Sequence, residues 1–160
     1  MIPESPTIIP PVGKSGPGMY FINSFTEISG LSITAIIPSI ASLRLCVAFI
    51  CGGETIVHLT GTGRGGRNQE LVLAAAEGIS DFENTYIFSF GSDGTDGPTD
   101  AAGAYASGNT ARQLSDAGFD ISKVLAENDS YTALKAIDSL IVTGPTGTNV
   151  NDLSVLLIKR

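Results

Sequence analysis

The hydrophobic pattern predicts strands and helices that alternate along most of the chain. Residues 45–51 (LCVAFIC) form a continuous apolar run with the length of an interior strand, and residues 85–90 (TYIFSF) have the same character. Residues 55–60 (TIVHLT) are rich in β-branched side chains and roughly alternating, which is typical of a strand. Residues 68–79 (NQELVLAAAEGI) combine a polar start with an apolar face at helical spacing, and they predict the clearest helix of the sequence.

The second half of the chain continues this alternation with shorter elements. Helices are expected near 101–107 and over 110–117, 122–126 and 130–137, and strands over 140–143 and 153–158. Strands that alternate with helices through short connections indicate an α/β fold. We therefore predict a layered domain with a central mixed sheet flanked by helices.

The N-terminal part of the chain lacks a comparable pattern. Residues 1–18 are rich in proline and glycine and predict an irregular arm, and a short helix is expected at 39–45. We divide the chain into an atypical, partly irregular N-terminal segment, residues 1–45, and an α/β domain, residues 46–160.

Composition and charge restrict the class of protein. The chain has 160 residues, 42% of them hydrophobic, which suits a globular domain, and its net charge of −7 argues against non-specific binding to nucleic acid or anionic membranes. Cys46 and Cys51 lie on opposite faces of one predicted strand, so buried free thiols and a reducing cytoplasm are expected. Pro38 and Arg44 interrupt the apolar stretch 31–51, which argues against a membrane span.

An acidic, glycine-rich loop follows the predicted strand 85–90. The loop, residues 91–103 (GSDGTDGPTDAAG), carries Asp93, Asp96 and Asp100. Carboxylates this close repel one another unless a cation or hydrogen-bond donors offset their charge, and Mg²⁺ is held by one or two such groups together with phosphate oxygens. Ligands also commonly bind at strand ends in α/β sheets. The alternative is local structure: aspartate before glycine is common in turns, and Asp100 can cap a helix.

A second glycine-rich loop, residues 61–66, precedes the predicted helix 68–79. The free N–H groups at the start of that helix favour an anion, and Arg67 can add a bidentate grip on a carboxylate or phosphate, with Arg64 beside it. The loop lacks the lysine of the GxxxxGK[ST] phosphate loop. The alternative is a glycine-rich turn with solvated arginines. A ligand site requires the arginine loop and the aspartate loop to open on the same side of one sheet.

Two further loops supply weaker candidates. Glu54 follows a Gly-Gly pair at a strand end, where it can point into the site or into solvent. His58 lies in the middle of a predicted strand, which favours a packing or surface role. The loop 144–152 offers uncharged hydrogen-bonding groups, namely Thr146, Thr148, Asn149 and Asn151.

Five blocks of this sequence together resemble the MOFRL domain. They are GGET at 52–55, GRGGRNQE at 63–70, GSDGTDGPTDAAGA at 91–104, END-SY at 127–131 and TGPTGTNVNDL at 143–153. The MOFRL domain is the C-terminal half of class II glycerate kinases, which are often labelled hydroxypyruvate reductases. The resemblance extends from about Cys46 to Arg160, with the blocks in family order.

The resemblance implies a glycerate 2-kinase, a transferase that uses ATP and Mg²⁺ to phosphorylate D-glycerate at its 2-hydroxyl. On chemical grounds we assign Arg67, Asp93 and Asp96 to catalysis. The other expected roles are metal binding by Asp93, Asp96 and Asp100, and substrate binding by Glu54, Arg64, Asn68, Thr146 and Asn149.

The resemblance also implies that this chain forms only one side of the active site. In the family the site lies in a cleft between this domain and a larger N-terminal domain, which this sequence does not contain, so the isolated chain is expected to turn over little. Two alternatives remain open: a hydroxypyruvate reductase, although no GxGxxG motif opens a helix after a strand, and a non-catalytic module that binds small anions.

Overall fold

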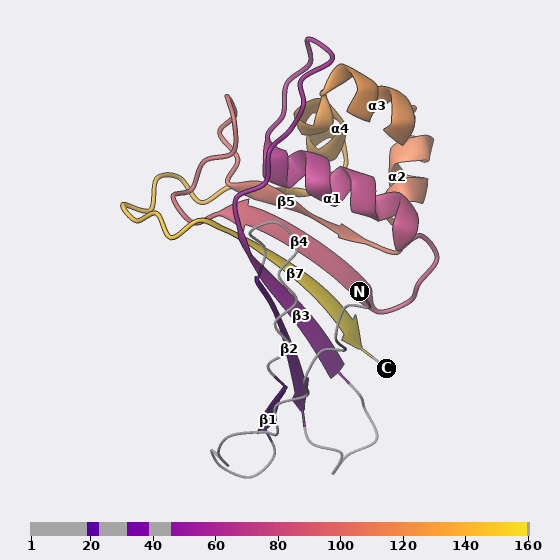
Figure 1. Ribbon diagram of the computed structural model, residues 1–160. Coiled ribbons are helices and arrows are strands. Elements are labelled where there is room, and N and C mark those ends of the chain that lie inside the picture. The colour runs from indigo at the N-terminus through magenta and orange to yellow at the C-terminus, as the bar shows by residue number, and fades with distance from the viewer. Residues whose placement is uncertain (1–18, 23–31, 39–45, 160) are drawn as a thin grey trace, which may run out of the picture.

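A single twisted sheet, with four helices grouped over one end of it, organises the chain (Figure 1). The computed structural model describes residues 19–22, 32–38 and 46–159, so the arm predicted at 1–18 and the helix predicted at 39–45 lie outside the described residues. The strands are β1 (Met19–Ile22), β2 (Ser32–Pro38), β3 (Cys46–Gly53), β4 (Thr85–Gly91), β5 (Gly103–Ser107), β6 (Leu140–Ile141) and β7 (Asp152–Lys159). The helices are α1 (Arg67–Gly78), α2 (Thr110–Asp116), α3 (Ile121–Glu127) and α4 (Ser130–Ala136).

Within the described residues the sheet has seven strands, in the order β1-β2-β3-β7-β4-β5-β6. Every pairing between them is antiparallel. The α/β class is confirmed, but the described sheet is antiparallel where a mixed sheet was expected. The reason is the last strand: β7 lies between β3 and β4 and separates these two strands, which run in the same direction. The order of elements along the chain does not reveal such an insertion.

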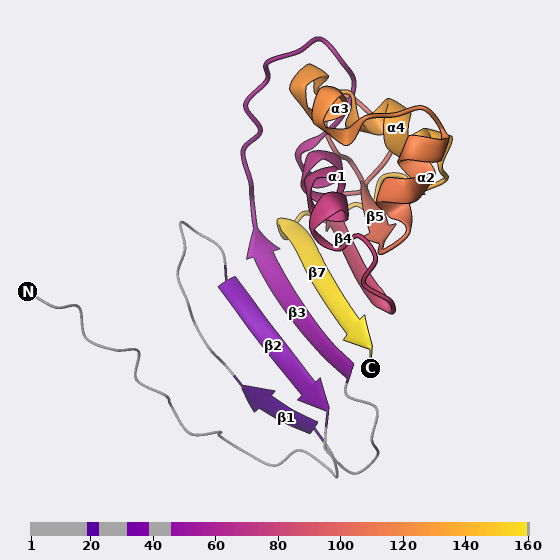
Figure 2. The ribbon, with the colours of Figure 1, turned by 90° about the vertical axis from the view of Figure 1, so that its right-hand side faces the viewer.

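The core lies between α1 and the strands β4 and β5. Val72, Leu73 and Ala76 of α1 are fully buried, and they pack against small side chains on β5, Ala104 and Ala106. Because the alanines add little bulk, α1 can approach the sheet closely. The three short helices extend the same cluster away from the sheet, while β1, β2 and β3 continue beyond the helices (Figure 2).

Most predicted elements are confirmed, but two segments differ. Residues 103–107 form β5 rather than a helix, because this small-residue stretch pairs with β4 on one side and β6 on the other. Gly103 makes that pairing possible, since a Cβ atom there would overlap the Ser89 carbonyl oxygen. Residues 55–60, expected as a strand, have no strand partner within the described part of the chain.

The structure also bears on the two cysteines and on the expected absence of a membrane span. Cys46 is exposed and Cys51 half-buried, so the thiols are free as predicted but less buried. Within the described ranges no helix is both long and apolar enough to cross a bilayer.

A leucine pair tests the position of the core. Leu73→Ala should lower the free energy of unfolding by about 3 kcal/mol, because Leu73 is fully buried under the helices and its loss leaves a cavity. Leu157→Ala, on β7 with 38% of the residue exposed, should cost less than about 1 kcal/mol. Urea unfolding measures both, and equal losses would contradict this core.

Candidate functional site

The first turn of α1 is held by the carboxylate of Asp96. Its Oδ1 accepts hydrogen bonds from the backbone N–H and side-chain amide of Asn68, at 3.1 and 3.3 Å. Its Oδ2 accepts from the backbone N–H and side-chain amide of Gln69, at 2.9 and 3.0 Å. The positive end of a helix favours an anion, and here the chain itself supplies one. The anion predicted at this helix start is therefore Asp96, which is only 1% exposed.

This contact brings the arginine loop and the aspartate loop together. A Cβ atom at Gly66 would overlap the Asp96 carboxyl group, and one at Gly97 would overlap the Gly65 carbonyl oxygen. Gly97 also has a φ of +62°, which favours glycine. The expectation that the two loops lie on the same side of one sheet is confirmed.

Asn68 lies inside the domain rather than in a binding site. It is 1% exposed, and its Oδ1 accepts from the Ser89 hydroxyl at 2.5 Å, which in turn meets the Ser154 hydroxyl at 2.6 Å. This network joins α1 to β4 and β7. The side chain predicted to bind substrate therefore positions α1 on the sheet.

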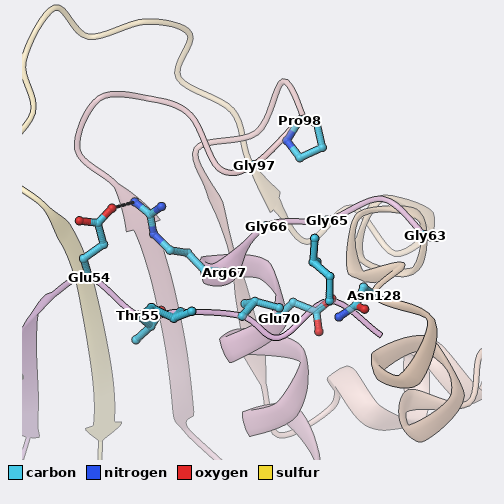
Figure 3. A pocket seen from close by; sticks show the side chains of 13 residues that line it. Glu54, Thr55, Gly63, Gly65, Gly66, Arg67, Glu70, Gly97, Pro98 and Asn128 are labelled. Atoms are coloured by element: carbon cyan, nitrogen blue, oxygen red, sulfur yellow. Dashed lines mark ion pairs between the residues drawn. The ribbon is translucent and has the colours of Figure 1, made fainter. Parts of the chain in front are cut away.

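Arg67, the first residue of α1, is braced by two carboxylates. Its Nε and Nη2 donate to the two oxygens of Asp152, and Nη2 also lies 3.2 Å from Glu54 Oε1 (Figure 3). The hydrogen bond to Asp152 raises the pKa of Arg67, so the guanidinium is charged at all relevant pH values. The edge of the guanidinium formed by Nε and Nη2 is occupied by Asp152, while Nη1 makes no hydrogen bond to any described residue.

Asp152 is a site residue that the sequence analysis missed. It is 6% exposed and begins β7 at the register position opposite Gly53, so the strand pairing holds it beside the end of β3. The available signal was that Asp152 is the one charged residue of GPTGTNVND and stands directly before a predicted strand.

Asp93 lies next to the pair formed by Arg67 and Asp152. A Cβ atom at Gly91 would be 3.1 Å from Asp93 Oδ1 and 3.4 Å from Asp152 Oδ1, so both carboxylates flank that glycine. Asp93 Oδ1 accepts from the N–H and hydroxyl of Thr95, at 2.9 and 3.0 Å, and these bonds lower the pKa of Asp93. Asp93 is therefore ionised and accessible.

The loop before β7 is tied to the aspartate loop. The Thr146 N–H donates to the Asp93 carbonyl oxygen at 3.1 Å, and the Thr146 hydroxyl donates to the Ser92 carbonyl oxygen at 2.5 Å. Asn149 is exposed and accepts from the Asn151 N–H at 3.1 Å. Thr146 thus supports Asp93, and Asn149 shapes its own turn.

Asp100 and Arg64 belong to a separate cluster around Tyr131. The Tyr131 hydroxyl donates to Asp100 Oδ1 at 2.7 Å, and the Arg64 guanidinium lies 4.4 Å from the centre of the tyrosine ring. Arg64 Nε also donates to the Pro98 carbonyl oxygen at 3.2 Å.

The three aspartates therefore do not gather into the predicted metal site. Asp96 bonds to the start of α1, Asp100 bonds to Tyr131, and Asp93 bonds to Thr95 within its own turn. Among the residues that the structure describes, no group of three or more His, Cys, Asp or Glu side chains is placed to hold a metal ion. Of the predicted trio, Asp93 alone lies beside Arg67 with its carboxylate accessible.

A cleft of about 650 Å³ opens beside Arg67 (Figure 3). One wall is backbone, from Gly65, Gly66 and Gly97, and the N–H groups of Gly65, Gly66 and Arg67 make no hydrogen bond to any described residue. The polar and apolar side chains of the cleft include Glu54, Arg67, Glu70, Asn128, Ile56, Val57 and Leu59. Free N–H groups and a fixed guanidinium that line the same cleft suit an anionic ligand.

Glu70 is a second cleft residue that the sequence analysis missed. Its Oε1 is buried without a hydrogen-bond partner, as is the hydroxyl oxygen of Ser130 at the start of α4. Burial raises the pKa of Glu70, and the nearby polar groups of Ser130 and Asn128 lower it by a smaller amount. His58, expected to have a packing or surface role, is exposed on the unpaired segment.

Removing Asp96 tests its role in holding α1. Asp96→Ala should lower the free energy of unfolding by about 3 kcal/mol, because buried donors of Asn68 and Gln69 lose their acceptor. Asp100→Ala, an exposed residue with one hydrogen bond to Tyr131, should cost about 1 kcal/mol or less. Urea unfolding at neutral pH compares them, and a similar small loss for both variants would refute the role.

The raised pKa of Glu70 gives stability a specific pH dependence. The folded state binds this proton more tightly than the unfolded state, so the contribution is fully present below the unfolded pKa and is lost as pH rises through the folded pKa. Glu70→Gln should therefore become progressively more stable than wild type between about pH 4 and pH 7. Unfolding measured across this range, with the exposed Glu77→Gln as control, checks it; a pH-independent difference for Glu70→Gln would contradict the assignment.

Comparison with known proteins assigns this arrangement to a family. The MOFRL family model matches residues 47–152. A D-glycerate 2-kinase from Thermotoga maritima is 54% identical over 116 residues, and the match covers 72% of this chain and 28% of the relative. A putative hydroxypyruvate reductase from Agrobacterium vitis is 40% identical over 135 residues, covering 83% of this chain and 35% of the relative.

A solved structure gives the same result. The crystal structure of a glycerate kinase from Thermotoga maritima superposes with a TM-score of 0.68 at 56% identity, and the match covers 69% of this chain and 27% of that one. The chain thus spans about a third or less of the length of these relatives. It belongs to the MOFRL family.

Proposed function

We propose that this chain is the C-terminal domain of a glycerate 2-kinase, which transfers a phosphoryl group from ATP to the 2-hydroxyl of D-glycerate. The observation that carries the proposal is Arg67, fixed by Asp152 and Glu54 at the edge of a cleft walled by glycine backbone. The names of the Thermotoga relatives support it.

Phosphoryl transfer depends mainly on position and on donors that stabilise negative charge. The Nη1 edge of Arg67 and the N–H groups of Gly65 and Gly66 are such donors, and they hold their places before any ligand arrives. Arg67 would bind the glycerate carboxylate or a phosphate group of ATP. Asp152 keeps the guanidinium from turning toward solvent.

Asp93 is the residue that fits a magnesium ion. Mg²⁺ takes one or two carboxylates and completes its shell with water and phosphate oxygens, so no larger acidic cluster is required. Asp93 is ionised, has an oxygen not engaged by Thr95, and lies beside Asp152. When bound, Mg²⁺ would neutralise charge on the phosphates, while Asp96 positions α1.

The other predicted contacts keep supporting roles in this proposal. Glu54 orients Arg67, Thr146 holds the Asp93 loop, and Arg64 and Asn149 lie where a larger ligand or another domain can reach them. Turnover requires the remainder of the kinase, because the match covers only 28% of the Thermotoga relative. We also propose that the domain begins at residue 46. We propose a cytoplasmic location as well, which the free thiols of Cys46 and Cys51 support.

Substitution of Arg67 tests the function. The chain is co-expressed with the region of the Thermotoga maritima kinase that it does not span, and ATP consumption with D-glycerate is measured. Arg67→Ala should lower kcat/KM by about 100-fold or more, since a fixed donor to developing charge is lost. The control is Arg112→Ala, an exposed residue of α2 that donates to Asn109.

The same mixture separates the alternatives. NADH oxidation with hydroxypyruvate and without ATP consumption would support the reductase named for the Agrobacterium relative and defeat the kinase proposal. Glycerate binding without any turnover, by the wild type and both variants, would support a non-catalytic anion-binding module.

A further inference from the structure

We infer that residues 55–60 are a β-strand whose partner lies in the part of the kinase that this sequence does not span. The sequence TIVHLT has the composition of a strand, yet in the structure it follows β3 without pairing to any described segment. Unpaired N–H and C=O groups along an extended segment are a template for another strand.

The segment is anchored at both ends. Before it, Gly53 pairs with Asp152 in the sheet, and Glu54 meets Arg67. At its C-terminal end, the N–H groups of Thr60 and Gly61 donate to Asn128 Oδ1 at 2.7 and 2.9 Å. Between these anchors the segment pairs with no described strand, so it is held at both ends with its middle unpaired within the described part of the chain.

Its side chains indicate that something covers it. Ile56 is 96% exposed and Leu59 is 75% exposed, the highest and third-highest values among the exposed large hydrophobic residues of the described chain. Residues 55–60 contain no lysine, glutamate, aspartate, arginine or proline, the residues with which proteins usually protect a free strand edge. A segment with exposed apolar side chains and no strand partner among the described residues is typical of an interface.

The position of the segment identifies its occupant. Ile56, Val57 and Leu59 line the cleft beside Arg67, so a strand docked along them would close the open side of that cleft. The relatives are about three times as long as the part that this match covers, and the chain outside the match supplies a candidate for that strand. The inference rests on the proposed function in naming the rest of the kinase as the partner.

Hydrogen exchange tests the pairing directly. The full chain is co-expressed with the region of the Thermotoga maritima kinase outside the match, and amide exchange of residues 55–60 is compared in the free chain and the co-purified complex. We expect at least about tenfold slower exchange in the complex, because paired amides are protected. Unchanged exchange in the complex, or a wild-type chain that does not co-purify, would overturn the inference.

Charged substitutions provide the matched control. Ile56→Asp and Leu59→Asp should each weaken the association by about tenfold or more, because a charge would be buried in the interface. Phe82→Asp, a residue 61% exposed beyond the C-terminal end of α1, should leave it unchanged. Urea unfolding confirms that the variants fold.

The remaining outcomes separate this inference from its alternatives. If all three variants bound the Thermotoga region with equal affinity, the inference that residues 55–60 pair with it would be wrong. So would self-association of the chain alone that Ile56→Asp and Leu59→Asp abolish, since a second copy would then be the occupant. If the amides of residues 55–60 were protected in a complex that does not phosphorylate glycerate, the strand pairing would stand. Only the kinase proposal would then be wrong.

Discussion

The carboxylate of Asp96 on the first turn of α1 is the contact on which the site depends. Helix starts carry unsatisfied N–H groups and partial positive charge, and a buried start needs an acceptor. Asp96 supplies it from a loop 28 positions further along the chain from Asn68, with its own charge buried among four donors. The contact fixes the aspartate loop over the glycine loop, and thereby places Arg67 and Asp93 on the same side of the sheet.

A second fixed group follows from this placement. Arg67 begins α1, so the helix that Asp96 orients also directs the guanidinium toward the ends of β3 and β7, where Glu54 and Asp152 receive it. A guanidinium bound to two carboxylates could be a purely structural ion pair. Here the guanidinium lines an open cleft together with glycine N–H groups that have no partner among the described residues, which is an arrangement suited to binding an anion.

The cleft beside Arg67 is open on one side. Its floor and polar side are built by this chain, while Ile56 and Leu59 stand exposed at its open side. The match covers only 28% of the Thermotoga kinase, and in the proposed function the opposite wall comes from outside this domain. In that proposal the reacting groups stay solvated until the two parts meet, which would tie phosphoryl transfer to assembly.

The sequence by itself determined the elements whose pattern is local: the apolar runs of β3 and β4, the amphipathic α1, the loops between them and the five blocks that resemble the MOFRL domain. Tertiary structure decided what local pattern leaves open. The small residues 103–107 suit helix or strand until β4 and β6 pair with them. Asp96 resembles a metal ligand until a helix start covers it, and Asp152 gains its role only because β7 inserts beside β3, 85 positions from the arginine it holds. Such long-range pairings have no local signal in the sequence, because burial and contact set the role of a charged group, and both are properties of the folded chain.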